Sequence, residues 1–394
     1  MKKITIIFQG LTNIQKILVL IILATIFYAG STSVSYSIFS GLKQTTPSPE
    51  TAGSSSVPTP ANALVEDPNE PKTEICPLNG SMHTKKAMEF WSKRRPLAVM
   101  IENHTEARPQ SGLSSADIVY EAVAEGGITR FMALFYCNLS DVQVGPVRSA
   151  RTYYLDWLGE YDALYAHVGG ANTPGPADAL GQIIKYKVKD LNQFSIGFPV
   201  FWRDYQRLGH SVATEHTMYS TTQKLWEVGA KRGWTATDSA GLKWEKSFTP
   251  WKFKDEKAGG TTAKINVSFW ENQGNYAVEW NYDNASNSYK RKNGGDLHKD
   301  LNNNTEISSK VVIIQFEKES NANDGYPGNV HLLYGTTGTG KALFFQDGIV
   351  TEGKWTKQSR TSRSKYTDST GKEIQFNKGQ IWIQTVPEGS KVSY

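Results

Sequence analysis

An uninterrupted apolar segment near the N-terminus is the first feature of the hydropathy pattern. No charged residue lies between Lys16 and Lys43, and Ile17–Phe39 supplies 23 residues, of which Ile17–Ala29 is strongly apolar. A helix needs about 20 such residues to span a bilayer. Because lysines precede the segment, the positive-inside rule places the N-terminus in the cytoplasm and the remainder outside. Residues 1–40 are therefore predicted to form a cytoplasmic tip and a single-pass anchor in the cell membrane.

A cleaved signal peptide is the alternative for this segment. Its apolar region would be Ile17–Ala29, followed by the small residues of Gly30–Ser33. The sequence lacks a clear small-x-small cleavage site there, which favours an uncleaved anchor. Both alternatives make the bulk of the protein extracytoplasmic.

Residues 41–75 carry a different pattern. They are rich in Pro, Ser and Thr and have no apolar periodicity. This composition is typical of a disordered, flexible linker. We expect these residues to form a tether between the membrane and the folded part.

Residues 76–248 alternate between strand-like and helix-like patterns, which predicts an N-terminal α/β domain. Gly126 and Gly127 separate two apolar runs and indicate a hairpin between them. The expected strands are 96–101, 117–124, 128–136 and 163–168, and the expected helices are 149–161 and 174–186.

Residues 249–394 show a new pattern, with short runs in which apolar and polar residues alternate. Turn clusters such as Asn293-Gly294-Gly295 and Asp347-Gly348 separate these runs. The pattern predicts a mostly antiparallel β domain. The fold class is therefore mixed α and β: an α/β domain followed by a β-rich C-terminal domain, after a transmembrane helix.

Charge and cysteine content narrow the class of protein. The net charge is +5, but residues 1–49 hold four lysines and no acidic residue, so the remainder is nearly neutral. A general basic surface for nucleic acid is therefore not expected. Cys76 and Cys137 are the two cysteines of the sequence, and outside the cell we expect them to pair as a disulfide. Two free thiols are the alternative.

The segment GPVRSAR (145–151) is the strongest candidate for binding chemistry. Arg148 and Arg151 flank Ser149, the expected N-cap of a helix. Cations at a helix N-terminus oppose the macrodipole, by roughly 0.3–1 kcal/mol each. A bound anion would explain them, since N–H groups and guanidinium groups would converge on it. Arg130 and His167 are expected at the edge of this anion site, and pairing of the arginines with nearby carboxylates such as Glu121 or Asp156 is the alternative.

Three carboxylates form a second candidate group. Asp117, Glu121 and Glu125 are spaced four residues apart, which places them on one face of either a helix or a strand. Such a group can perform acid–base chemistry or hold a divalent cation. A solvated polar strand face is the alternative. His104 and His216 lie in polar loops and are secondary candidates.

One motif does not support a nucleotide site. Gly335–Lys341 has the spacing of a phosphate-binding loop, but Ala342 stands where a magnesium-binding hydroxyl is required. The residues after it have the pattern of a strand, so the sequence predicts no helix N-terminus that could bind phosphates there. We expect neither a nucleotide nor a nucleic acid as partner.

Several sequence blocks resemble the YerB-like family of bacterial proteins over roughly residues 90–394. The blocks are RPLAVMIENH (95–104), ARPQSGLSSADIVYEAVAEGGITRFMALF (107–135), GPVRSAR (145–151), YDALYAHVGG (161–170), FWRD (201–204) and HTMYS (216–220), with GTGKALFFQDG and GQIWIQTVP further on. The resemblance implies an exported, membrane-tethered, often lipid-modified protein of two parts. It implies no catalytic residues, and here a predicted transmembrane anchor replaces the lipid-modified cysteine.

The leading functional hypothesis is a cell-envelope protein that binds an anionic ligand, such as a wall polymer or a lipid-linked precursor. One alternative is a metal-dependent enzyme for phosphoryl transfer or hydrolysis of envelope polymers. In it, Glu121 or Glu125 would bind a divalent cation and His167 or His216 would act as acid or base. A purely structural or protein-interaction module is the other alternative, and the sequence assigns no cofactor.

Overall fold

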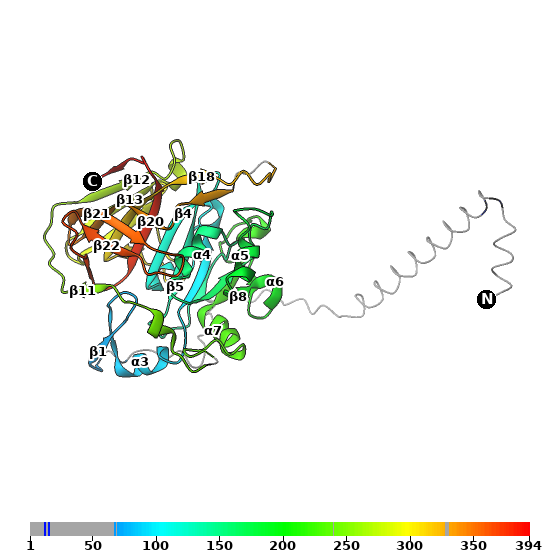
Figure 1. Cartoon of the computed structure of the whole chain (residues 1–394), viewed down its shortest axis with the longest axis horizontal. Coiled ribbons are helices and arrows are strands. Elements are labelled where there is room, and N and C mark those ends of the chain that lie inside the picture. Colours follow the sequence, from blue (N-terminus) through cyan, green and yellow to red (C-terminus); the bar gives the residue numbers. More distant parts are fainter. Residues whose placement is uncertain (1–11, 13–14, 16–66, 68, 239, 328–330) are drawn as a thin grey trace, which may run out of the picture. The chain divides into compact units, whose positions relative to one another are not determined.

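A mixed sheet of ten strands forms the centre of the described part of the chain (Figure 1). Its strands run in the order β22 (Lys365–Asp368), β21 (Ile349–Lys357), β20 (Gly338–Gln346), β17 (Val311–Glu317), β24 (Ile381–Pro387), β4 (Ile118–Glu125), β5 (Ile128–Phe135), β3 (Leu97–Glu102), β7 (Leu164–His167) and β8 (Lys189–Asn192).

The computed structural model describes residues 12, 15, 67, 69–238, 240–327 and 331–394. The predicted membrane anchor and most of the predicted tether lie outside these residues. The last four residues of the predicted tether, Lys72–Ile75, form strand β1, which pairs with β2 (Met82–Thr84). Within the residues that the structure describes, no helix combines the length and the apolar character that crossing a membrane requires.

One parallel pairing joins the two predicted domains in the central sheet. Strand β24 runs beside β4, with Ile381 opposite Ile118 and Gln384 opposite Glu121. The sheet therefore takes five strands from residues 76–248 and five from residues 249–394. The boundary near residue 248 stays a prediction, but the two segments share one continuous sheet.

A second, antiparallel sheet covers one face of the central sheet. It contains β15 (Asp296–Leu297), β14 (Ser288–Asn293), β13 (Val278–Asp283), β12 (Lys264–Val267) and β25 (Val392–Ser393), with β16 (Ser308–Ser309) paired to β14. Two side chains of this sheet reach the central one: Trp280 Nε1 donates to Gln384 Oε1 at 2.9 Å, and Arg291 pairs with Glu121.

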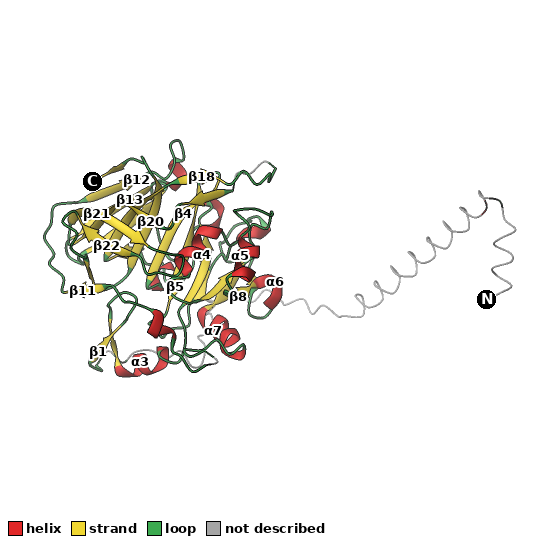
Figure 2. Cartoon of the chain, viewed as in Figure 1, coloured by secondary structure: helices red, strands yellow, loops and turns green. Residues whose placement is uncertain are grey.

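Short helices cover the opposite face, as Figure 2 shows for α4 and α5. Trp157 of α4 stacks on Tyr120 with ring centroids 5.4 Å apart, and Tyr153 donates to the Val123 carbonyl at 2.7 Å. Neighbouring residues of a strand face opposite sides, so Tyr120 points to the helices while Glu121 points to the second sheet. The helices are α3 (Lys85–Trp91), α4 (Thr152–Leu158), α5 (Ala179–Lys185), α6 (Gln193–Ile196) and α7 (Thr222–Lys231).

Three small sheets complete the described fold. Strand β10 (Met218–Thr221) lies between β6 (Gln143–Val144) and β9 (Trp202–Arg203). The remaining pairs are β11 (Lys252–Lys254) with β23 (Gln375–Asn377), and β18 (Glu319–Asn321) with β19 (Leu332–Tyr334). The fold is thus a mixture of α and β in which strands predominate.

Two local predictions are confirmed. Strands β4 and β5 form an antiparallel hairpin, and Gly126 and Gly127 at its turn have φ of 55° and 79°. Glycine adopts such left-handed angles without steric cost. Cys76 and Cys137 form a disulfide, with their Cα atoms 5.9 Å apart. The bond attaches the residue after β1 to the end of the β5 segment.

Candidate functional site

A cavity of about 610 Å³ opens at the carboxyl end of strand β7. Gly169 has φ of +58°, and a Cβ atom there would lie 2.9 Å from the Phe194 ring, so the narrow backbone turn at the cavity requires glycine. We name this cavity the Arg148 pocket. It is lined mainly by Arg148, Ser149, Gly169, Gly170, Asn172, Phe194, Arg203, Thr214, Glu215 and Met218.

Backbone hydrogen bonds fix Arg148 at the pocket. Its N–H donates to the Met100 carbonyl at 2.9 Å, and its carbonyl accepts from Val168 at 3.0 Å, so the residue is held between the ends of β3 and β7. Its Nε donates to Glu102 Oε1 at 3.0 Å, and 27% of the side chain is exposed. Within the described residues, neither terminal nitrogen of Arg148 has a hydrogen-bond partner.

Arg203 supplies a second guanidinium group. It ends strand β9 and is exposed, and its Nη1 donates to the Thr214 carbonyl at 2.5 Å and to Thr217 Oγ1 at 3.2 Å. The other nitrogens of its side chain make no hydrogen bond with the residues that the structure describes. Two arginines and one carboxylate, Glu215, thus line the pocket, and the guanidinium nitrogens without protein partners are the groups that can bind an anion.

Glu102 connects the pocket to a histidine. Its Oε2 accepts a hydrogen bond from His216 Nδ1 at 2.8 Å, while Oε1 accepts from Arg148. Burial raises the pKa of Glu102, but the hydrogen bond from His216 and the charge of Arg148 outweigh burial and hold the pKa below its usual value. The same hydrogen bond raises the pKa of His216.

Arg130 and Arg151 lie apart from this pocket's lining and share one carboxylate. Arg130 Nη2 is 3.0 Å from Glu125 Oε2, and Arg151 forms an ion pair with the other oxygen of Glu125. Burial lowers the pKa of Arg151. Both guanidinium groups are paired within the fold, although with Glu125 and not with Glu121 or Asp156.

The predicted N-cap is wrong. Helix α4 begins at Thr152, so Arg151 and not Ser149 is its N-cap, and the helix is shorter than the predicted 149–161. Tertiary contacts hold the preceding residues extended, because Val147 bridges to Ile101 and Ala150 bridges to Gly170. Ser149 instead offers its carbonyl to Arg130 Nη1 at 2.8 Å. The predicted arrangement, in which Arg148 and Arg151 flank a helix N-cap at Ser149, is therefore wrong.

His167 lies in the core beneath the pocket. Its side chain is fully buried, and its ring nitrogens are 2.7 Å from the Gly169 carbonyl and 2.7 Å from Asp190 Oδ1. Both ring nitrogens have partners, so neither is free to bind a ligand. The contact with the Gly169 carbonyl instead holds the backbone of the pocket lining in place.

The three predicted carboxylates are separated. Asp117 lies beside the disulfide and accepts from the backbone of Tyr136 at 2.7 Å. Glu121 is fully buried in an ion pair with Arg291, 2.8 Å from its Oε1. A β-bulge between Val123 and Glu125 breaks the alternation that would keep Glu125 in line. The three carboxylates therefore do not form one site that could bind a metal.

The structure brings His104 and His216 together, although 112 positions separate them in the sequence. Their rings stack with centroids 4.7 Å apart. The sequence analysis grouped neither residue with Glu102 and assigned no role to Arg203. The only sequence signal for Arg203 is its place in the FWRD block between an aromatic and an acid.

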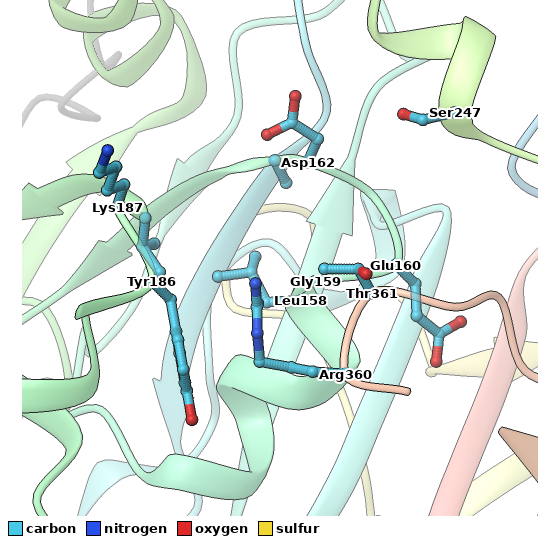
Figure 3. Close-up of a pocket in the computed structure, with 11 residues that line it drawn as sticks. Leu158, Gly159, Glu160, Asp162, Tyr186, Lys187, Ser247, Arg360 and Thr361 are labelled. Atoms are coloured by element: carbon cyan, nitrogen blue, oxygen red, sulfur yellow. The ribbon is translucent and has the colours of Figure 1, made fainter. Parts of the chain in front are cut away.

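Another cavity, of about 420 Å³, lies beside the end of α4. Figure 3 shows Arg360 facing Tyr186 there, and the guanidinium carbon lies 4.3 Å from the ring centroid. Glu160 points away from both and pairs with Lys357 and Arg363. Asp162 pairs with Arg95 and Lys189.

Comparisons with known proteins place the chain in a family. The family model described as "Protein of unknown function (DUF3048) N-terminal domain" matches residues 80–235, and the corresponding C-terminal domain matches residues 265–383. YerB of Bacillus subtilis strain 168, named as a candidate lipoprotein, is 32% identical over 325 residues, which cover 82% of this chain and 88% of YerB.

A crystal structure of the YerB protein from Bacillus subtilis is also similar. Its TM-score is 0.67 at 29% identity, and the match covers 82% of this chain and 100% of that one. Together with the sequence blocks around GGITRF and GPVRSAR, these matches confirm the resemblance found in the sequence. The chain belongs to the DUF3048 family of YerB-like proteins.

Proposed function

We propose that the protein is an exported, membrane-attached component of the cell envelope that binds an anionic ligand in the Arg148 pocket. The ligand is a phosphate or carboxylate group of a wall polymer or of its lipid carrier. The observation that carries the proposal is the pair of arginines, Arg148 and Arg203, on one cavity of about 610 Å³. Guanidinium groups bind planar or tetrahedral oxyanions through paired N–H donors.

The location rests on two further observations. Disulfides such as Cys76–Cys137 persist outside the reducing cytoplasm. The relative YerB is named as a candidate lipoprotein, a class attached to membranes from outside the cytoplasm. The disulfide supports export, and the relative supports attachment to a membrane; the anchor at residues 17–39 is part of the proposal.

The pocket that we propose differs from the anion site expected from the sequence. It keeps Arg148, whose terminal nitrogens have no partner among the described residues. It replaces Arg151 and Arg130 by Arg203, since both of the others pair with Glu125 and lie outside the pocket lining. His167 contributes by supporting Gly169 and makes no contact with the ligand. The arrangement supports binding of an anion by Arg148 and Arg203.

The experiment that tests this function measures binding by the full chain in detergent. The probes are poly(glycerol phosphate) and undecaprenyl phosphate, with dextran and undecaprenol as uncharged controls. We expect one phosphate probe to bind and its affinity to fall with ionic strength. Binding of the polymer alone identifies a wall-polymer site, and binding of the lipid alone identifies a carrier site.

Variants locate the binding. Arg203→Gln and Arg148→Gln should each weaken phosphate binding by roughly 10- to 100-fold, the effect of one charged hydrogen bond. Arg232→Gln removes an exposed guanidinium outside the pocket and serves as the matched control. Equal affinities of the wild type and the two pocket variants would disprove the proposal, as would equal binding of charged and uncharged probes.

A further inference from the structure

We propose that His104, Glu106 and His216 form a binding site for a divalent transition metal, for which Zn²⁺ is the best match. The site lies beside the Arg148 pocket and shares Glu102 with it, but its proposal does not depend on anion binding there. His104 and Glu106 belong to the short 3₁₀ segment η1 (Thr105–Ala107) and its N-cap, and His216 ends the segment η3 (Thr214–His216). The three potential ligand atoms lie within 4.8 Å of one another.

His216 is oriented as zinc-binding histidines are. Its Nδ1 donates to Glu102 Oε2 at 2.8 Å, which fixes the ring and leaves Nε2 as the free nitrogen. A carboxylate behind a histidine ligand is the usual arrangement in zinc sites, because it sets the tautomer and increases the basicity of the ring. Only 5% of the His216 side chain is exposed, so the ring keeps this direction.

Glu106 and His104 complete a set of three ligands. Glu106 Oε2 is 3.7 Å from His216 Nε2, and its side chain is 56% exposed and can rotate. A tetrahedral zinc with bonds of about 2.0–2.1 Å holds its ligand atoms about 3.3 Å apart. His104 Nδ1 accepts one long hydrogen bond of 3.2 Å from the Glu106 N–H, which a metal bond can replace.

The surrounding charges favour a cation. Glu102 and Glu106 contact His216, and Glu215 adds a third carboxylate beside it, whereas Arg148 is the cation that faces it. Two imidazoles and one carboxylate suit Zn²⁺ better than Mg²⁺ or Ca²⁺, which prefer oxygen ligands. Three protein ligands leave a fourth position open. Among the residues that the structure describes, the other cluster of candidate ligands is Cys76, Asp117 and Cys137, and it is excluded because its sulfurs form the disulfide.

The test uses the untagged full chain in detergent after removal of metal with EDTA. Zn²⁺ binding is measured by competition with a chromophoric chelator, and Co²⁺ binding by its visible absorption spectrum. We expect one Zn²⁺ per chain and a cobalt spectrum of low coordination number. Glu106→Gln and His104→Ala should weaken Zn²⁺ binding at least tenfold, since each removes one ligand.

A matched control separates the site from other histidines. His210→Ala removes an exposed imidazole from the same part of the chain and should leave the affinity for Zn²⁺ unchanged. Glu106 is exposed and His104 is partly buried, so their variants should fold, which thermal unfolding without metal verifies. Failure of the wild type to compete with the chelator would overturn the proposal. So would an unchanged affinity in both His104→Ala and Glu106→Gln.

Discussion

Arg148 and Glu102 form an ion pair in which the arginine Nε lies 3.0 Å from the carboxylate Oε1. The second oxygen of Glu102 accepts from His216 at 2.8 Å. One buried carboxylate therefore orients a cation of the Arg148 pocket and a ring of the proposed metal site. The two sites are neighbours because they share this residue.

Glu102→Gln should affect both sites. The amide keeps the size of the side chain but loses the charge that holds His216 and Arg148 in place. We expect Zn²⁺ affinity to fall roughly 10- to 100-fold, as for other carboxylates behind a histidine ligand. Affinity for the phosphate probe should change as well, because Arg148 loses its partner. Competition and titration experiments on one preparation measure both effects, and an unaltered Zn²⁺ affinity would contradict the role of Glu102.

Arg151→Gln should distinguish a structural arginine from a binding one. Arg151 pairs with Glu125 and is almost fully buried, so its loss leaves Glu125 with Arg130 alone. We expect lower stability in urea, by about 1–3 kcal/mol, and unchanged affinity for phosphate probes. Arg203→Gln should show the reverse. Loss of phosphate binding in Arg151→Gln with normal folding would return this residue to the binding site.

The pair of Glu121 and Arg291 should stabilise the contact between the two sheets. Both side chains are fully buried, and Glu121 also accepts from Trp382 and Gln384. Arg291→Met alone leaves a buried carboxylate without its cation, which costs about 3–5 kcal/mol. Adding Glu121→Gln should recover part of that loss. Urea unfolding of the two single variants and the double variant measures the coupling, and strictly additive effects would show that the pair is not coupled.

Glu317 should make stability depend on pH. Burial, together with the nearby charge of Asp156, raises the pKa of Glu317 from 4.5 to about 8. Between these values the folded protein holds a proton that the unfolded chain releases. The contribution of Glu317 to the free energy of unfolding is therefore greatest at low pH and decreases as pH rises towards 8.

Glu317→Gln should remove this dependence. The variant should gain stability relative to the wild type as pH rises from about 5 to about 8, by up to a few kcal/mol, and the difference should then stay constant. Urea unfolding at a series of pH values provides the comparison. A difference that is constant over the whole range would mean that Glu317 has an ordinary pKa.

Features encoded by neighbouring residues were predictable from the sequence. The hairpin of β4 and β5 follows from two apolar runs and the Gly126-Gly127 turn. The disulfide follows from two cysteines in an exported segment. The α/β and β-rich character of the two segments follows from their periodicity, which depends on side chains a few positions apart.

Features that depend on distant contacts were not predictable. The pairing of β24 with β4 joins residues more than 260 positions apart, and the contact of Arg291 with Glu121 joins residues 170 positions apart. The start of α4 depends on bridges from Val147 and Ala150 to other strands, so capping rules for Ser149 did not apply. The meeting of Arg148 with Arg203, and of His104 with His216, likewise depends on how separate loops reach the ends of β3 and β7.

The position of a bound oxyanion in crystals of the protein is the most direct test of anion binding by Arg148 and Arg203. Tungstate mimics phosphate, and its anomalous scattering locates it without ambiguity. We expect a tungsten peak in the Arg148 pocket, with oxygens within hydrogen-bond distance of Arg148 and Arg203. The peak should be lost in crystals of Arg203→Gln. An empty pocket in crystals that bind tungstate elsewhere would disprove anion binding by these arginines, as would an unchanged peak in the variant.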